Sequence, residues 1–483
     1  MRSSDISLKG LLFIMKINHA FLLLMLITQK MPWTDGDCLY NADLRYCSCS
    51  LSDLNNIVSI VSCIQASSFE FKGGSFLYTH VNILYNVEME QVLAMIQLPL
   101  TKVRFVDVTL SEEFLSTFLK WIYKIPIEVL AFENATFAGK SNWPYITETP
   151  PRISSLQFVN VPTYPLFDRA LTFPGLGNWI FKLEELTLKK SNIRSIPCNA
   201  SRYFEDLSRL DLSGNFLEDN DILALFCRGS FPKLKTLTLQ SNNFKNFDTV
   251  CQSINKYSQL VQLDLSQNNF SNMSTSLCNW KSSLLLLNLT DTGLEEINFI
   301  LPRNCEVLDL SYNKLDSLNI SLVNLKELYL SYNKFATIPI TANLPNLEIL
   351  ALNGNPIKTL QLGQLQHYKR LRIIRADNIL YMCSCSLNHE IKEIKKSGLT
   401  LQHWPDEYTC ESPMLSKGKL VSEVYHSFFE CHKPLLTVII CIVALLVCIA
   451  AVICWVKIHR SNKMRSQNVR TGNMNSVQFQ SQT

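Results

Sequence analysis

The sequence predicts an α/β solenoid, a curved stack of short strand-containing repeats, because one nine-residue pattern recurs between Leu207 and Asn355. The pattern is L-x-x-L-x-L-x-x-N, in which the leucines of a short strand point into a shared core. The Asn side chain can hydrogen-bond backbone groups where the chain turns off the strand. Cysteine clusters at both ends of the array and a long apolar segment after it complete the prediction. The six copies begin at Leu207, Leu234, Leu260, Cys305, Leu325 and Leu347.

This signature is that of leucine-rich repeats, so we expect a leucine-rich-repeat horseshoe over residues 98–380. Degenerate copies at Leu100, Ile127 and Ile153 keep the apolar positions but lose the Asn, and Leu183 begins the regular part. The early repeats are longer than the late ones. They have room for helices on the convex side, whereas late repeats allow extended returns, so curvature should change along the array. The third apolar position falls at residues 105, 132, 158, 188, 212, 239, 265, 289, 310, 330 and 352.

Two apolar segments flank the array and predict its topology. Residues 1–36 are interpreted as a removed secretory leader, with Met15 as an alternative start, because their apolar run is too short for a signal anchor. Residues 434–456 carry no charge and are long enough for one transmembrane helix. The tail, residues 457–483, has five basic residues and no acid, which places it in the cytoplasm. We therefore expect a single-pass type I protein of the plasma membrane rather than a glycolipid-anchored one, since polar residues follow the apolar segment.

Charge and cysteine content narrow the class of protein. The formal net charge is +4, and outside the leader and the basic tail the chain is nearly neutral, so a nucleic-acid partner is not expected. Thirteen of the sixteen cysteines lie between Cys38 and Cys431, in the part expected to be extracellular. Six N-x-S/T sequons lie in the same part, which indicates a secretory-pathway glycoprotein. They are Asn134, Asn199, Asn269, Asn272, Asn288 and Asn319.

The cysteines predict a cap at each end of the solenoid, since an open end would expose core leucines. The amino-terminal set belongs to a cap and pocket region over residues 37–97, and its spacing lacks the paired C-x2-C of zinc sites. A second set closes the array at residues 381–432. Between the sets, Cys198 with Cys227 and Cys251 with Cys278 are plausible staples, although spacing leaves the connectivity open. Cys305 is expected to be a buried free thiol. The two cap sets are Cys38, Cys47, Cys49 and Cys63, and Cys383, Cys385, Cys410 and Cys431.

Large apolar residues without an evident register fill the amino-terminal third. They are consistent with a plain core, or with an apolar cavity between the cap and the irregular repeats that would suit a lipid. Lys72, Lys102 and Arg104 would then supply basic groups for lipid phosphates at the rim. The candidate pocket residues are Phe69, Phe71, Phe76, Leu77, Ile83, Leu84, Val87, Leu93, Ile96, Phe105 and Phe118.

No catalytic or metal-binding constellation is found in the sequence. The eight histidines show no paired spacing, and G-x-S-x-G, phosphate-loop and H-E-x-x-H motifs are absent. We therefore expect neither an enzyme nor a cofactor or metal site. The alternative to a lipid receptor is an adhesion or protein-ligand receptor that uses the concave strand face, with Tyr312 and Tyr329 as candidate contacts.

The chain resembles the ectodomains of Toll-like receptors. The resemblance rests on the array, the C-x-C caps, Asn355-Pro356 and the span. A tail over residues 457–483 is too short for their cytoplasmic signalling domain, so signalling would fall to a partner, or the protein would be a decoy receptor. A closer resemblance is to the monocyte differentiation antigens of the cluster-of-differentiation fourteen type, over roughly residues 38–356. It rests on Cys38 to Cys49 with Asp43-Leu-Arg45 inside, Phe69-Glu-Phe71-Lys-Gly73-Gly74, Leu207 to Asn215, Ala224 to Cys227, Cys278-Asn-Trp280 and Val307 to Ser311.

The second resemblance implies a co-receptor of innate immunity and the inflammatory response. Such proteins bind lipopolysaccharide and other acylated microbial lipids in an amino-terminal hydrophobic pocket. They take the lipid from a lipid-transfer serum protein, pass it to a Toll-like receptor complex, and are often homodimers. The chain departs from this family after Asn355, where it adds repeats, a cap and a span in place of a glycolipid anchor. The implied disulfides are Cys38 to Cys49, Cys47 to Cys63, Cys198 to Cys227, and Cys251 to Cys278.

Overall fold

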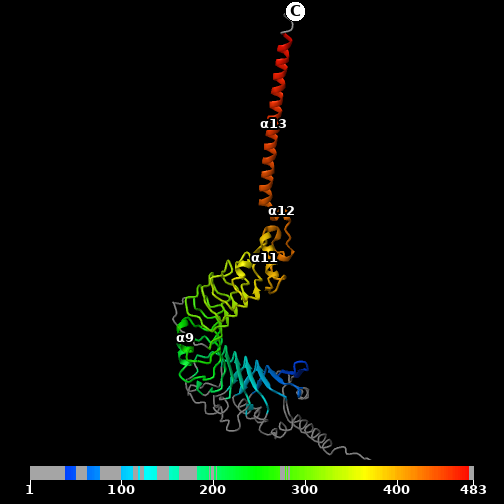
Figure 1. Cartoon of the computed structure of the whole chain (residues 1–483). Helices are drawn as coiled ribbons and strands as arrows, with labels where there is room; N and C mark the ends of the chain where they lie inside the picture. Colours follow the sequence, from blue (N-terminus) through cyan, green and yellow to red (C-terminus); the bar gives the residue numbers. More distant parts are fainter. Residues whose placement is uncertain are drawn as a thin grey trace, which may run out of the picture.

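The protein is a leucine-rich-repeat solenoid built on one long sheet, as the sequence predicts (Figure 1). Within the described residues this sheet has sixteen strands, and each pairs in parallel with the next except for the antiparallel hairpin of β1 and β2. The computed structural model describes residues 38–50, 63–76, 99–111, 118–119, 125–138, 152–162, 182–194, 196, 201–202, 204–271, 278, 280 and 283–477. The leader at residues 1–36 lies outside them.

The strands of the long sheet follow the order of the repeats. Strands of the amino-terminal half are mostly five residues long, and those of the regular repeats are three. They are β1 (Cys38–Asn41), β2 (Tyr46–Ser50), β3 (Ser68–Lys72), β5 (Lys102–Val106), β7 (Val129–Glu133), β9 (Ser155–Val159), β10 (Glu185–Lys189), β11 (Arg209–Asp211), β12 (Thr236–Thr238), β13 (Gln262–Asp264), β14 (Leu286–Asn288), β15 (Val307–Asp309), β16 (Glu327–Tyr329), β17 (Ile349–Ala351), β18 (Ile373–Arg375) and β20 (Thr400–Leu401).

In the part of the chain that the structure describes, two small sheets accompany the long one. The first follows the irregular repeats and joins β4 (Ser75–Phe76), β6 (Thr109–Ser111) and β8 (Thr136–Ala138). The second lies in the carboxyl-terminal cap and pairs β19 (Leu380–Met382) with β21 (Thr409–Ser412).

The leucines of the repeat form the core because the register of the sheet places them over one another. Leu210 pairs with Leu237, and Leu237 pairs in turn with Leu263, so equivalent side chains meet along the whole stack. These leucines are buried, as the pattern predicts. Stacking of many repeats supplies the apolar area that a single repeat lacks.

The repeat asparagines are buried and satisfy the backbone where the chain leaves each strand. Asn242 donates through Nδ2 to the carbonyls of Leu212 (3.1 Å) and Leu239 (2.9 Å). Its Oδ1 accepts from the backbone N–H groups of Asn215 and Leu217, both at 3.0 Å. Each asparagine thus links two successive turns of the solenoid, which confirms the role expected from the pattern.

Repeat length decides the structure of the convex side. The longer repeats carry α8 (Asp219–Leu225) and α9 (Phe247–Ile254), the latter capped by the Asn246 side chain, which accepts from the Thr249 N–H. Residues 283–361, in the short repeats, form no helix. The prediction that the convex segments change from helices in the long repeats to extended chain in the short ones is therefore confirmed for these repeats.

The carboxyl-terminal cap continues the sheet through β20 and covers the last repeat. Disulfides Cys383–Cys410 and Cys385–Cys431 hold its loops. Its helix α11 begins after Ser384, whose hydroxyl accepts from the Leu387 N–H. The helical elements at this end, α11 included, are α10 (Leu362–Leu365), α11 (Cys385–Lys396), η2 (Met414–Ser416), η3 (Val421–Glu423) and α12 (Phe428–Cys431).

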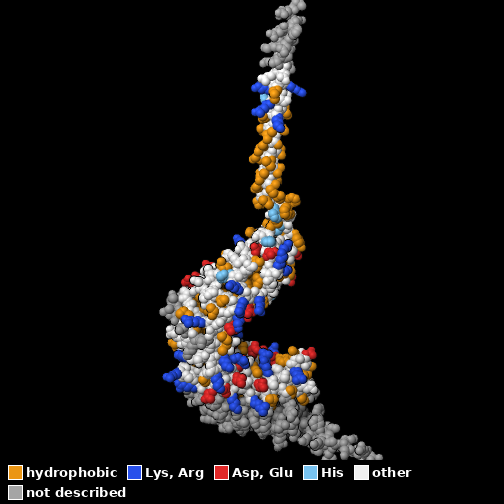
Figure 2. All heavy atoms as spheres, in the orientation of Figure 1, with side chains coloured by type: hydrophobic (Ala, Val, Ile, Leu, Met, Phe, Trp, Pro, Cys, Tyr) orange, Lys and Arg blue, Asp and Glu red, His pale blue; other side chains and the backbone are white. Residues whose placement is uncertain are grey.

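One helix after the cap is long and apolar enough to cross a membrane. Helix α13 (Lys433–Val477) contains the candidate span Lys433–Asn468, which includes the predicted residues 434–456. Figure 2 shows apolar side chains along this helix and basic groups beyond them. The pattern of an apolar stretch followed by lysine and arginine matches the expected single span.

Candidate functional site

A column of stacked phenylalanines runs through the amino-terminal repeats. The rings of Phe71, Phe105, Phe132 and Phe158 stack in turn, with centroids 5.4, 5.4 and 5.1 Å apart. Neighbouring strands are about 4.8 Å apart, so residues in register bring flat rings into contact. Positions 105, 132 and 158 are third apolar positions that hold phenylalanine where later repeats hold leucine. The residues of this column could therefore be recognised in the sequence.

The column is buried inside the array, and its amino-terminal ring is only partly buried. Phe105, Phe132 and Phe158 are each 1% exposed, and Phe105 also meets the edge of the Phe118 ring. Phe71 and Phe118 are only partly buried and pack on the core. Phe105 thus has the packing of a core residue, whereas Phe71, the ring of the column nearest the amino-terminal cap, is partly exposed.

The remaining candidate pocket residues divide into two groups. Phe69 is buried beside Phe71, with ring centroids 6.1 Å apart, and Phe76 lies in β4. Leu77, Ile83, Leu84, Val87, Leu93 and Ile96 lie outside the described residues.

One of the basic groups expected at the pocket rim, Arg104, already forms ion pairs with carboxylates. Arg104 lies between Glu70, at 3.0 Å, and Glu133, at 2.7 Å, on the exposed face of β3, β5 and β7. Its guanidinium therefore already has carboxylate partners, in contrast to the expected role in binding phosphate. Lys72 is exposed and Lys102 is partly exposed. These two lysines remain the basic groups at this end that fit a phosphate.

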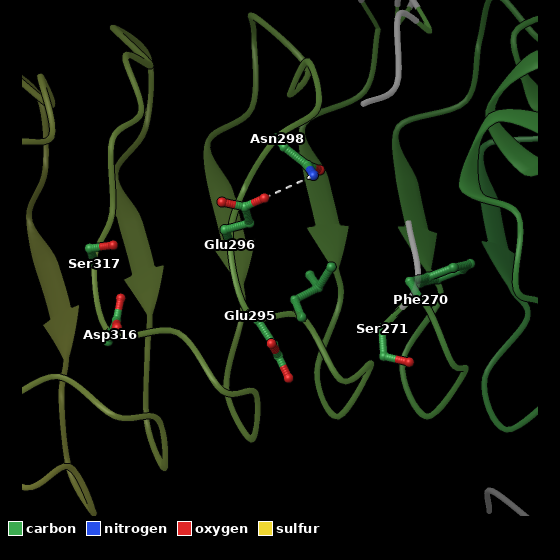
Figure 3. Close-up of a pocket in the computed structure, with 8 residues that line it drawn as sticks. Phe270, Ser271, Glu295, Glu296, Asn298, Asp316 and Ser317 are labelled. Carbon is green, nitrogen blue, oxygen red and sulfur yellow. Dashed lines mark hydrogen bonds between the residues drawn. The ribbon is translucent and has the colours of Figure 1, made fainter. Parts of the chain in front are cut away.

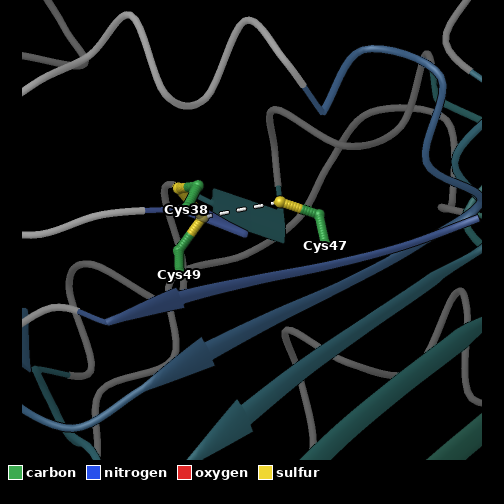
Figure 4. Close-up of side chains that lie close together, drawn as sticks. All are labelled: Cys38, Cys47 and Cys49. Atoms are coloured by element: carbon green, nitrogen blue, oxygen red, sulfur yellow. Dashed lines mark hydrogen bonds between the residues drawn. A yellow bond between two sulfur atoms is a disulfide. The ribbon is translucent and has the colours of Figure 1, made fainter. Parts of the chain in front are cut away.

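Disulfides stabilise the amino-terminal cap, which precedes the phenylalanine column. Cys38 is bonded to Cys49 and Cys47 to Cys63, the pairs that the resemblance implies. Figure 4 shows Cys38, Cys47 and Cys49 close together, with Sγ of Cys47 3.8 Å from Sγ of Cys49. Because these sulfurs are in disulfides, they are not available as thiolate ligands of a metal ion.

Two further cysteine predictions concern the middle of the array. Cys251 is bonded to Cys278, and Cys227 is disulfide-bonded, while Cys198 lies outside the described residues. Cys305 is a buried free cysteine, as expected, and burial raises the pKa of its thiol to about 12. The thiol is therefore neutral at physiological pH and fits a packing role rather than a reactive one.

A hollow of about 340 Å³ lies between successive turns in the middle of the array (Figure 3). Glu295, Glu296 and Asp316 line it, and Glu295 also pairs with Lys314 at 3.2 Å. Carboxylates desolvated by an acyl chain would carry a large energetic cost. This hollow is therefore not the lipid pocket expected from the sequence.

Two tyrosines form an exposed aromatic pair on the regular repeats. Tyr312 (54% exposed) stacks on Tyr332 (39% exposed), with ring centroids 4.5 Å apart. The Tyr332 ring lies over Gly354, where a Cβ atom would clash with it. Tyr329 is less exposed, and its hydroxyl donates a hydrogen bond to Glu327 at 2.7 Å. The pair that the structure brings together is thus Tyr312 with Tyr332, and sequence reasoning missed the second member.

The sequons differ in where they lie on the solenoid. Asn134, Asn269 and Asn319 are exposed, whereas Asn199 and Asn272 lie outside the described residues. Asn288 is in β14, with Asp264 and Asp309 beside it in register on the concave strand face.

Comparison with known proteins agrees with this architecture. A family profile described as "Leucine Rich repeats (2 copies)" matches residues 323–367. The chain is 29% identical to Toll-like receptor 2 type-1 of Gallus gallus over 388 residues, 79% of this chain and 49% of that protein. It is 31% identical to Toll-like receptor 2 of Bison bison over 302 residues, 62% of this chain and 38% of that protein. The chain spans half or less of the length of these curated relatives.

Among solved structures, the mouse RP105/MD-1 complex contains a similar chain. The TM-score is 0.49 at 17% sequence identity, over 76% of this chain and 68% of that one. The sequence relatives reported above are Toll-like receptors, and the chain is a leucine-rich-repeat protein similar to them.

Proposed function

We propose that this chain is a cell-surface pattern-recognition co-receptor of innate immunity. In this proposal it is a type I protein of the plasma membrane that binds lipopolysaccharide and related acylated microbial lipids at its amino-terminal end. It then passes the lipid to a Toll-like receptor complex. Similarity to Toll-like receptor 2 over most of the chain supports the receptor class. The resemblance to lipopolysaccharide co-receptors over residues 38–356 supports the ligand.

The observation that carries the proposal is the partly exposed Phe71 at the amino-terminal end of the phenylalanine column, together with the exposed leucines of the cap. Phe71 and Phe118 are only partly buried, and Phe71 lies in register with Cys49 of the cap. The cap itself exposes Leu39 (73%) and Leu44 (71%), and Figure 2 shows apolar side chains at this end of the array. Covering such surface with acyl chains contributes about 25 cal/mol per Å². Lys72 and Lys102 lie on β3 and β5, where they fit the phosphates of the lipid headgroup.

A second candidate function is a receptor for a protein ligand, favoured by the exposed Tyr312 and Tyr332 pair. Rigid tyrosines are common anchors in protein interfaces. Against it, a glycan on the sequon at Asn288 would stand on the concave face beside β13 and β15. We therefore favour the lipid function.

Binding of fluorescent lipopolysaccharide to the full chain in nanodiscs tests the proposal. We expect saturable binding, and we expect L39D/L44D to weaken it at least tenfold. Burial of a leucine contributes about 1.5–3 kcal/mol, and each 1.4 kcal/mol is a tenfold change in affinity.

The matched control is Leu223→Asp, which replaces an exposed leucine on α8, on the convex side. Its affinity should equal that of the wild type. Tyr312→Ala should also bind normally, and loss of binding in Tyr312→Ala alone would favour the second candidate function.

A further inference from the structure

We propose that the junction between the last repeat and the carboxyl-terminal cap is a binding site for a divalent zinc ion, with Asp377, His403 and Glu407 as ligands. Asp377 follows β18 in the last repeat, and the other two residues follow β20 in the cap. One ligand atom from each lies within 4.8 Å of the other two. The site is independent of the proposed lipid function and lies at the opposite end of the array.

The distances fit a zinc ion. Nδ1 of His403 lies 3.7 Å from Oδ1 of Asp377 and 3.5 Å from Oε2 of Glu407. Ligand atoms about 2.1 Å from a tetrahedral ion lie roughly 3.4 Å from one another. The two distances from His403 are thus within a few tenths of an ångström of this value, and the two carboxylates lie within 4.8 Å of each other.

The buried carboxylate supplies an independent reason for a ligand. Asp377 is 2% exposed, and its Oδ1 has no hydrogen-bond donor within the described part of the chain. A buried carboxylate oxygen without a partner is costly. The 3.7 Å between this oxygen and Nδ1 of His403 is too long for a hydrogen bond. A cation between them would satisfy it.

Asn378 holds the two carboxylates in place. Its side-chain amide donates to Oδ2 of Asp377 at 3.1 Å and to Oε2 of Glu407 at 3.3 Å. Its backbone N–H donates to the Glu407 carbonyl at 3.1 Å. Hydrogen bonds of this kind orient ligands around metal sites.

The donor set indicates which ion fits. One imidazole and two carboxylates suit zinc, whereas calcium and magnesium prefer oxygen ligands alone. His403 and Glu407 are exposed, which leaves a coordination position for water. The ion would join the last repeat to the cap.

Zinc binding by the full chain, purified in detergent micelles without a histidine tag and stripped with a chelator, tests this site. Equilibrium dialysis against Zn²⁺ should show one ion per wild-type chain that His403→Gln and Glu407→Gln bind at least tenfold more weakly. Both replaced side chains are exposed, so the variants should keep the circular dichroism spectrum of the wild type. His389→Gln, which replaces an exposed histidine on α11, is the control and should bind as the wild type does.

The X-ray absorption spectrum of the bound zinc should show nitrogen and oxygen ligands without sulfur. Equal zinc content in the wild type, His403→Gln and Glu407→Gln, whether one ion or none, would overturn the proposal.

Discussion

Phe105→Glu is expected to prevent the chain from folding and reaching the cell surface. The Phe105 ring is enclosed by Phe71 and Phe132 on its faces and by Phe118 at its edge. A glutamate there would lose these contacts, which for Phe→Ala costs about 3–5 kcal/mol. It would also place a carboxylate in an apolar core, so the total loss approaches or exceeds the 5–15 kcal/mol of a typical domain.

Surface staining of intact cells measures this result. The matched control is Val129→Glu on the neighbouring strand β7, where the side chain is partly exposed and lies in register with Lys102. The control should reach the surface at the wild-type level. Normal surface levels of Phe105→Glu would show that Phe105 is not enclosed, and would restore it as a wall of a lipid pocket.

Asn313→Ala is expected to lower the free energy of unfolding by about 3 kcal/mol or more. Nδ2 of Asn313 donates to the carbonyls of Leu289 and Leu310, both at 2.9 Å. Its Oδ1 accepts from the N–H groups of Thr292 (3.1 Å) and Leu294 (3.0 Å). Alanine would leave these buried groups without partners, and each such group costs about 1–3 kcal/mol.

Urea denaturation of the full chain in detergent, followed by tryptophan fluorescence, measures the difference. Asn346→Ala is the control, because Asn346 lies near the surface with a 2.6 Å hydrogen bond to the Val323 carbonyl. The free energy of unfolding of Asn346→Ala should be lower than that of the wild type by no more than about 1 kcal/mol. Equal losses in both variants would contradict the linking role of the repeat asparagines.

The repeats could be predicted from the sequence because their information is local. In Leu234 to Asn242, the leucine spacing alone decides which side chains face the core, and the final asparagine marks where the chain turns. The helices of the longer repeats followed from the number of residues between strands. The same reasoning found Cys305 in the core, since it stands where other repeats have leucine.

The contacts between repeats were harder to predict. Phenylalanine at positions 105, 132 and 158 was visible in the sequence, but stacking depends on the register between strands, which the spacing does not report. Arg104 was expected to be a free basic group, and its two partners come from the strands on either side.

The cluster of Asp377, His403 and Glu407 is a third case. It forms because β20 pairs with β18 across the intervening helix α11. No local sequence motif indicates that the chain comes back to pair with β18.

Photocrosslinking with lipopolysaccharide that carries a photoreactive acyl chain tests the central claim most directly. Intact cells that display the full chain would be labelled, and the modified peptides identified by mass spectrometry. The lipid function predicts labelling within residues 38–138, around the cap and the amino-terminal end of the phenylalanine column. Labelling confined to the repeats around Tyr312 and Tyr332, or no labelling above that of the L39D/L44D variant, would contradict it.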